Sequence, residues 1–246
     1  MRKYLWVAAT ATMAVLVYAQ LSAGQLLANY AKTLSEAKSL KVSYTVISTD
    51  GASQAYQLAL AKPNMARIET PGEVITADGT TLVHFDKAQK TYYRDPQNDQ
   101  VLRGLLNEDQ FAVWNAFFNG NAFSKASAKS LGTMNRKGVQ LNAVEASFDD
   151  GKKKIVYYLS PQDSLARQAE IGYADTGSNK LIVNTKSIEV GGDAKAESFA
   201  FNAPAGSHEL TEEERLSAEW YDDLEKAKEV AAKTKRLIFI DFYAEW

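Results

Sequence analysis

The side chains most often used in catalysis are few in this sequence and far apart. The chain has two histidines, His84 and His208, and no cysteine, which is too small a set of zinc ligands to predict a metal site. A histidine without converging partners does little acid–base chemistry. The neighbouring acids Asp149 and Asp150 precede a glycine in a predicted turn, where we expect both to be solvated. We therefore predict no metal site and no catalytic site.

Motifs for cofactors are missing as well. The sequence contains no Gly-x-Ser-x-Gly elbow, no phosphate-binding glycine loop and no dinucleotide fingerprint. The pair Gly191-Gly192 fits a turn. We predict that this chain needs no cofactor and is not an enzyme.

The end of the sequence resembles a redox protein. A capping box at Thr211 and Glu214 predicts a helix to about residue 234, and the apolar run 237–243 predicts a strand buried on both faces. Residues 237–246 (LIFIDFYAEW) resemble the strand before the Cys-x-x-Cys of thioredoxin-like proteins, where a helix N-terminus lowers the thiol pKa. The resemblance implies that Asp241 is the buried acid beside the dithiol and that Trp246 precedes the nucleophile. Residues 211–246 would then be the truncated start of a thioredoxin-like domain, in a fragment of a longer protein.

The first residues predict export from the cytoplasm. Arg2 and Lys3 precede an apolar run over residues 5–17 and then small residues, which is the layout of a secretory signal peptide. A membrane-spanning helix needs roughly 20 apolar residues, more than this run provides. We predict that residues 1–23 are a signal peptide cleaved between Ala19 and Ala23. The mature protein would be periplasmic or otherwise extracytoplasmic, without a permanent membrane span.

Charge and cysteine content limit the possible partners and the source of stability. The chain has 28 basic and 30 acidic residues, and loss of Arg2 and Lys3 with the signal leaves a net charge of −4. No long block of like charge occurs, so we predict no nucleic-acid partner. Without cysteine, neither a disulfide nor a thioether-linked lipid is available, and the fold must depend on its hydrophobic core.

The remaining pattern predicts a sheet with few helices. Apolar residues at helical spacing predict an amphipathic helix over residues 25–38. From residue 41 the period changes to two, and Val42, Tyr44 and Val46 alternate with polar residues up to the turn at Asp50-Gly51. Turn signals about every ten residues predict roughly nine strands in an antiparallel meander. The fold class is therefore α+β, dominated by one large curved sheet.

One helical stretch interrupts the strands and is rich in large aromatic side chains. Phe111, Trp114, Phe117 and Phe118 lie at helical intervals, behind a candidate cap at Asn107. Residues 105–123 are therefore predicted to form a lid or helical cover. The alternative is that these aromatics fill the end of a core, as aromatic stripes usually do.

The order of elements over residues 24–204 resembles the LolA-like group of periplasmic lipoprotein-localisation factors and outer-membrane lipoprotein-sorting proteins. The resemblance implies an unclosed antiparallel barrel whose concave face, partly covered by helices, holds acyl chains. Residues 205–210 would be a linker. The likeness depends on residues 27–40 with Tyr30-Ala31-Lys32, and on Lys62-Pro63, Asp78-Gly79, Tyr92-Tyr93 and Pro96.

A strongly curved sheet with an apolar inner face leaves room for a ligand groove. No motif fixes the alignment to the family inside the sheet, so the lining residues are chosen by residue type and strand parity, and each could equally belong to a plain core. The candidates are Val42, Tyr44, Tyr56, Leu58, Trp114 and Phe117.

Three functions are open at this point. The first is an extracytoplasmic binding or carrier domain for lipid or lipidated protein, whose partners are acyl chains or an envelope protein. The second is a thiol–disulfide oxidoreductase in the full-length protein, with the β domain as its docking module. The third is a purely structural interaction domain whose sheet face is filled by its own side chains.

Overall fold

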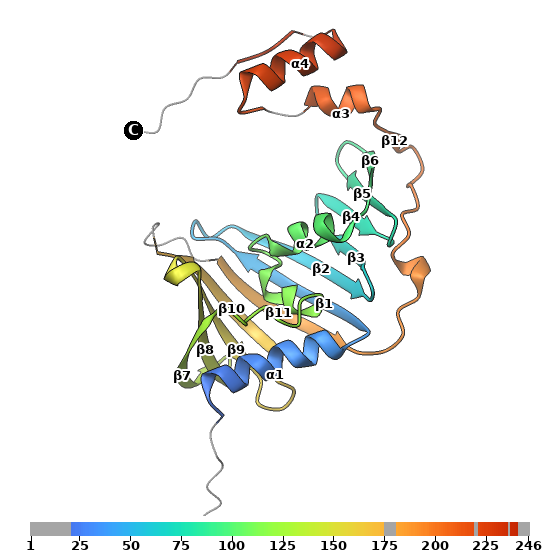
Figure 1. Cartoon of the computed structure of the whole chain (residues 1–246). Coiled ribbons are helices and arrows are strands. Elements are labelled where there is room, and N and C mark those ends of the chain that lie inside the picture. Colours follow the sequence, from blue (N-terminus) through green and yellow to red (C-terminus); the bar gives the residue numbers. More distant parts are fainter. Residues whose placement is uncertain (1–20, 175–180, 219–220, 236, 241–246) are drawn as a thin grey trace, which may run out of the picture.

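The computed structural model describes residues 21–174, 181–218, 221–235 and 237–240. Most of the predicted signal peptide, and both Asp241 and Trp246, lie outside these residues. Among the described residues, twelve strands form one strongly curved sheet, and helices α1 (Ala23–Glu36) and α2 (Asp99–Asn107) lie against its inner face (Figure 1).

The strand order is linear, β12-β6-β5-β4-β3-β2-β1-β11-β10-β9-β8-β7. Different strands occupy the two ends, so the sheet is an unclosed barrel. Every pairing between the described strands is antiparallel except the parallel pair of β12 with β6. The expected α+β class with one large antiparallel sheet is confirmed. The bounds are β1 (Ser39–Ile47), β2 (Ser53–Ala61), β3 (Met65–Glu69), β4 (Glu73–Ala77), β5 (Thr81–Asp86), β6 (Thr91–Pro96), β7 (Ser127–Arg136), β8 (Val139–Phe148), β9 (Lys153–Leu159), β10 (Ala166–Tyr173), β11 (Leu181–Val190) and β12 (His208–Glu209).

The first helix and hairpin follow the predicted pattern. A capping box between Ser22 and Gln25 starts α1, whose apolar face is buried against the sheet. In the β1–β2 hairpin, Val42 lies opposite Leu58 and Tyr44 opposite Tyr56. These four side chains alternate with polar ones, which leaves them on the concave face.

The predicted helix over residues 107–118 is wrong in detail. Asn107 ends α2 instead of capping a helix, and α2 is capped by Asn98, whose side chain accepts from the Val101 N–H at 2.9 Å. The aromatic residues that follow lie on and beside a 3₁₀ helix, η1 (Ala112–Phe117). Phe111, Trp114 and Phe117 are three residues apart. Because a 3₁₀ helix has three residues per turn, this spacing aligns their side chains on one side.

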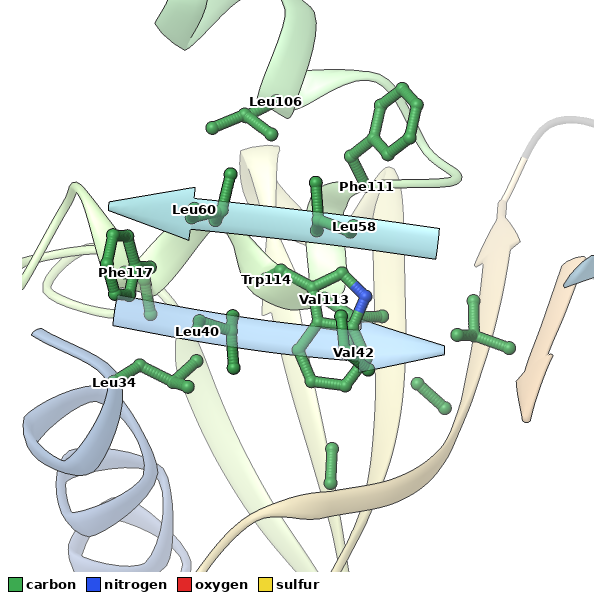
Figure 2. Close-up of a cluster of buried hydrophobic side chains, with 14 of the residues drawn as sticks. Leu34, Leu40, Val42, Leu58, Leu60, Leu106, Phe111, Val113, Trp114 and Phe117 are labelled. Carbon is green, nitrogen blue, oxygen red and sulfur yellow. The ribbon is translucent and has the colours of Figure 1, made fainter. Parts of the chain in front are cut away.

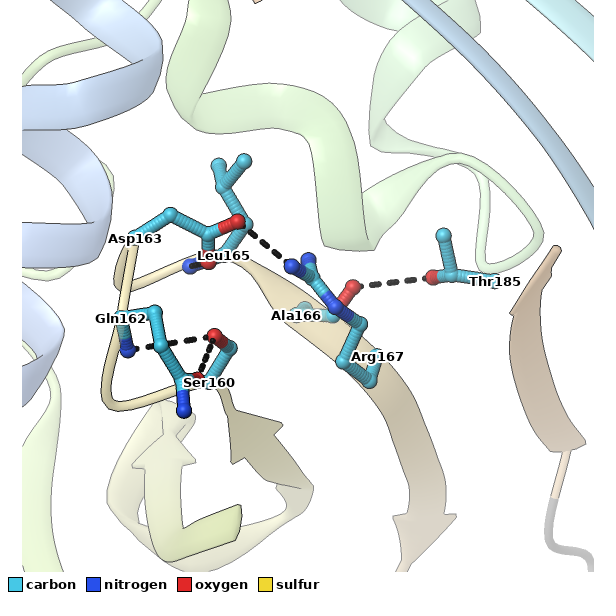
Figure 3. A network of polar contacts seen from close by, with 7 residues as sticks. All are labelled: Ser160, Gln162, Asp163, Leu165, Ala166, Arg167 and Thr185. Carbon is cyan, nitrogen blue, oxygen red and sulfur yellow. Dashed lines mark hydrogen bonds and ion pairs between the residues drawn. The ribbon is translucent and has the colours of Figure 1, made fainter. Parts of the chain in front are cut away.

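A tight turn connects β9 to β10 and is held by side-chain hydrogen bonds. Figure 3 shows its polar contacts: Asp163 accepts from the Leu165 N–H at 3.0 Å and pairs with Arg167, and the Thr185 hydroxyl donates to the Ala166 carbonyl at 2.9 Å. Partial burial acts to raise the pKa of Asp163, but the Leu165 N–H and the Arg167 charge outweigh it and lower that pKa. The turn is followed by a β-bulge between residues 166 and 168, which increases the local twist of the sheet.

The segment after β11 runs back along the outer face. We name residues 199–210 the strap. Its Phe201 ring packs on Phe85 and Tyr92 of β5 and β6, at 5.7 and 4.9 Å between centroids. The His208 N–H donates to the Lys90 carbonyl at 2.9 Å and the Leu210 N–H to the Tyr92 carbonyl at 2.7 Å. The predicted linker 205–210 therefore contains strand β12 and lies along β6.

Two short helices follow the strap. The predicted capping box is confirmed, because the Glu214 N–H donates to the Thr211 hydroxyl and the Thr211 N–H to the Glu214 carboxylate, at 3.2 and 2.8 Å. The single helix expected here is divided into α3 (Glu212–Ala218) and α4 (Leu224–Thr234), with Asp223 capping the second.

The strand predicted over 237–243 is not formed in its described part, residues 237–240. Leu237 is fully exposed and Phe239 is 78% exposed. A strand of this composition needs sheet neighbours on both sides, and no described strand is paired with it.

Candidate functional site

The structure brings the six predicted lining residues together on the concave face, but in a closed core. Figure 2 shows Val42 and Leu58 on neighbouring strands with Trp114 beside them, and Phe117 farther along the same strands near Leu40 and Leu60. Trp114 and Phe117 are both completely buried, and Tyr56 alone of the six is partly exposed. The Tyr44 ring stacks on Tyr56 at 5.2 Å between centroids and lies 5.7 Å from Trp114. Whether these residues ever contact a ligand stays a prediction.

The interior is closed by one aromatic segment that is not part of the sheet. We name residues 111–123 the aromatic plug. Its backbone N–H groups donate to nearby carbonyls in the chain, such as Trp114 to Phe111 at 2.8 Å and Phe118 to Asn115 at 3.2 Å. Among the described residues, we find no backbone hydrogen bond from the plug to a strand. The plug is therefore attached to the sheet through side chains.

One attachment of the plug comes from α1 and the strands beneath it. The Tyr30 hydroxyl, buried in the core, donates to the Val113 carbonyl. Burial raises the pKa of Tyr30 well above its usual value, and nearby Tyr157 raises it further. The Phe123 ring lies 6.0 Å from Tyr30 and 5.4 Å from Tyr157 between centroids. This aromatic cluster fixes the C-terminal half of the plug.

A second attachment, which we name the latch, lies just before the plug. The Asp109 carboxylate accepts from the Lys153 ammonium at 2.7 Å and from the Tyr173 hydroxyl at 2.5 Å. Burial acts to lower the pKa of Lys153, but the hydrogen bond and charge of Asp109 outweigh it and raise that pKa. The latch thus joins the segment before the plug to strands β9 and β10.

Two polar atoms inside the closed core have no hydrogen-bond partner among the described residues. These are the Tyr44 hydroxyl and the Trp114 indole N–H, both on almost completely buried side chains. Burial raises the pKa of Tyr44 well above its usual value, Tyr56 adds to the rise, and the adjacent Trp114 indole opposes it. The two groups are therefore near each other without reaching hydrogen-bond geometry. An unpaired buried polar group costs about 1–3 kcal/mol.

Two grooves lie outside this interior. The first, which we name the helix groove, has a volume of about 350 Å³ and lies between α1 and the residues around the end of the plug. The second, about 230 Å³, lies on the outer face of β1, β2, β3 and β11, and its charged residues include Lys41, Arg67, Glu69 and Glu189. The helix groove is lined by Gly24, Leu27, Ala28, Ala31, Lys32, Ser35, Gly120, Asn121, Phe123, Ser124, Ala126 and Ala128.

The histidines take structural positions. His84 stacks on Tyr93 at 4.8 Å between centroids, and burial lowers its pKa. His208 lies 3.2 Å from the Glu214 carboxylate. In the part of the chain that the structure describes, no three His, Cys, Asp or Glu residues gather where they could hold a metal ion. No described helix is both long enough and apolar enough to cross a membrane.

Sequence reasoning did not identify the latch or the role of Tyr30. Asp109 is 44 residues from Lys153 and 64 from Tyr173, and such a distant combination leaves no periodic signal. Tyr30 could be recognised as buried from the helical spacing in α1, but its hydrogen bond to the plug could not.

Comparison with known proteins gives structural similarity only. No protein-family model matches the chain, and no curated protein matches it. An uncharacterised conserved protein of Thermus thermophilus has a TM-score of 0.49 and 10% identity, over 76% of this chain and 98% of that one. A LolA superfamily protein of Nitrosomonas europaea has a TM-score of 0.35 and 12% identity, over 74% and 99%. The Mycobacterium tuberculosis lipoprotein LppX has a TM-score of 0.41 and 11% identity, over 70% and 96%. At these values we base function on the residues of this chain.

Proposed function

We propose that this chain is a non-enzymatic, extracytoplasmic binding or carrier domain for lipid or lipidated protein, in which an acyl chain displaces the aromatic plug. The observation that supports this most strongly is how the plug is attached. It fills the concave face with Trp114 and Phe117, yet its backbone hydrogen bonds stay local in the chain. A segment attached in this way can leave without breaking the sheet.

Exchange of the plug for a ligand would replace one set of apolar contacts with another. The plug contributes mainly apolar contact to the interior, and an acyl chain can provide the same kind of contact, at roughly 25 cal/mol per Å² buried. The unpaired Tyr44 hydroxyl and Trp114 N–H make the closed state less stable than a fully satisfied core. Displacement of Trp114 into water would hydrate its indole N–H and offset part of the cost of opening.

Mass spectrometry of the protein purified from its native envelope tests this proposal. Released acyl species in stoichiometric amount are expected, and they should return when stripped protein is incubated with the same envelope lipids. Protein that carries no acyl species, and takes up none, would contradict the proposal.

A structural interaction domain is the second candidate, and it is favoured by the filled interior itself. In that case the plug is permanent core, and the unpaired groups are a tolerated defect. Uptake of acyl species distinguishes the two, because a permanent core leaves no space for them.

The oxidoreductase alternative depends on the resemblance of residues 237–246 alone, of which 241–246 lie outside the described part. A Cys-x-x-Cys directly after Trp246 in the full-length protein would support it. Any other sequence at that point would remove it.

A further inference from the structure

The helix groove has the volume and length to accommodate a single alkyl chain. Its volume of about 350 Å³ is more than twice the roughly 150 Å³ of an engineered cavity that binds benzene. From Gly24 to Ser35 it follows α1 for roughly 16 Å at 1.5 Å per residue. Small side chains leave it open, because Ala28 and Ala31 of the helix and Ala126 beyond the plug are among its lining residues. The result is an open groove beside the helix, in which apolar surface only slightly exceeds polar surface.

The lining of the helix groove carries a single charge. Of its twelve residues only Lys32 is charged. The Lys32 ammonium is 3.9 Å from the Glu36 carboxylate, and both side chains are more than two-thirds exposed, so this ion pair is weak. Ser35, Asn121 and Ser124 add uncharged hydrogen-bonding groups. A groove with a partly apolar lining and one weakly paired cation complements an alkyl chain with an anionic head group.

We propose that the helix groove binds a single-chain anionic amphiphile, with its alkyl chain along α1 and its head group at Lys32. The inference rests on the proposed function, because it names the ligand class and adds a binding place for the alkyl chain outside the interior that the plug fills. Phe123 connects the two sites: it lines the groove and also packs on Tyr30 and Tyr157 in the core. A fatty acid and a lysophospholipid with an acidic head share this chemistry.

Binding of cis-parinaric acid and of its uncharged methyl ester, followed by fluorescence on the full chain, tests the inference. Ala28→Leu fills the groove from an exposed helix position, and Asn29→Leu adds the same side chain at the next exposed position, outside the groove. Lys32→Gln removes the charge, and Lys233→Gln is its control, a helical lysine that also pairs with a glutamate four residues away. Circular dichroism confirms that each variant is folded.

We expect Ala28→Leu to weaken binding of both probes at least about tenfold, and Lys32→Gln to weaken binding of the acid alone, by about threefold. Both controls should bind like the wild type. Competition with dodecanoate and with lysophosphatidylglycerol identifies the source of the head group, and competition by neither overturns the inference.

Wild-type affinity in both Ala28→Leu and Lys32→Gln would overturn the inference and leave the proposed function in place, since the alkyl chain of the probe would then bind elsewhere on the protein. A wild-type protein that binds neither the acid nor the ester would overturn the inference together with the proposed function.

Discussion

Two aromatic segments cover opposite faces of the same sheet, and they are attached in different ways. The strap places Phe201 on Phe85 and Tyr92 of the outer face and is fixed to β6 by backbone hydrogen bonds of strand type. The plug places Trp114 and Phe117 on the inner face, and among the described residues we find only side-chain contacts that fix it to the sheet and to α1. The two covers therefore differ in backbone attachment and not in aromatic content. On the proposed function, this difference separates a structural cover from one that a ligand displaces.

The largest expected effect compares one ring from each cover. Trp114→Ala removes a fully buried side chain and should lower the free energy of unfolding by about 3–5 kcal/mol. Phe201→Ala removes a partly exposed ring and should lower it by about half as much. Urea denaturation measures both. A saturating acyl ligand should recover more of the loss in Trp114→Ala, where it fills the vacated space. Equal recovery of the free energy of unfolding in both variants would contradict the proposed difference between the plug and the strap.

The latch should matter more for ligand entry than for global stability. Asp109→Ala removes the acceptor of Lys153 and Tyr173, and we expect a loss of about 1–2 kcal/mol with faster ligand uptake. Its control is Asp95→Ala, which breaks the ion pair of Asp95 with Arg215 next to the strap, at 3.0 Å. Stopped-flow fluorescence should show faster uptake in Asp109→Ala only. Acceleration in both variants would show that uptake reflects general loosening.

The start of α1 gives an expectation for signal cleavage. The cap residue Ser22 would be kept by cleavage after Ala19 and lost by cleavage after Ala23, and loss of such a cap costs about 1 kcal/mol. Because α1 carries the Tyr30 attachment of the plug, we expect cleavage after Ala19. N-terminal sequencing of the exported protein measures this, and a mature chain that begins at Gly24 would contradict it.

The smallest effect is expected at the unpaired hydroxyl. Tyr44→Phe removes a buried group that has no described hydrogen-bond partner, so the free energy of unfolding should stay the same or rise, within about 1 kcal/mol. Thermal denaturation of the variant beside the wild type measures it. A clear loss of stability would mean that the hydroxyl is satisfied and that the plug belongs to a well-paired core.

The parts of the fold that could be predicted are those with a local signal. The helical spacing in α1 and the alternation through Val42 and Tyr44 identified the first helix, the first hairpin and the class of fold. Strand β7 has no local sequence signal, because its ten residues are largely polar and exposed and lack alternation. Only residues 205–210 of the strap are predicted as a linker, and the pairing of β12 with β6 is not predicted there, because hydrogen bonds to β6 leave no trace in local composition.

The candidate site was predictable only by residue type. Strand parity placed Tyr44, Tyr56 and Leu58 correctly on the inner face, and the aromatic spacing located Trp114 and Phe117 as their cover. Whether the interior was open could not be read from the sequence, because it depends on how a distant segment packs. The latch had no sequence signal for the same reason.

Amide hydrogen exchange with and without a bound acyl ligand tests the central claim most directly. The account predicts that ligand binding speeds exchange at the Trp114 and Phe118 amides of the plug and leaves the His208 and Leu210 amides of the strap unchanged. Plug amides that are equally or better protected in the loaded protein would contradict it, because the plug would then still occupy the interior.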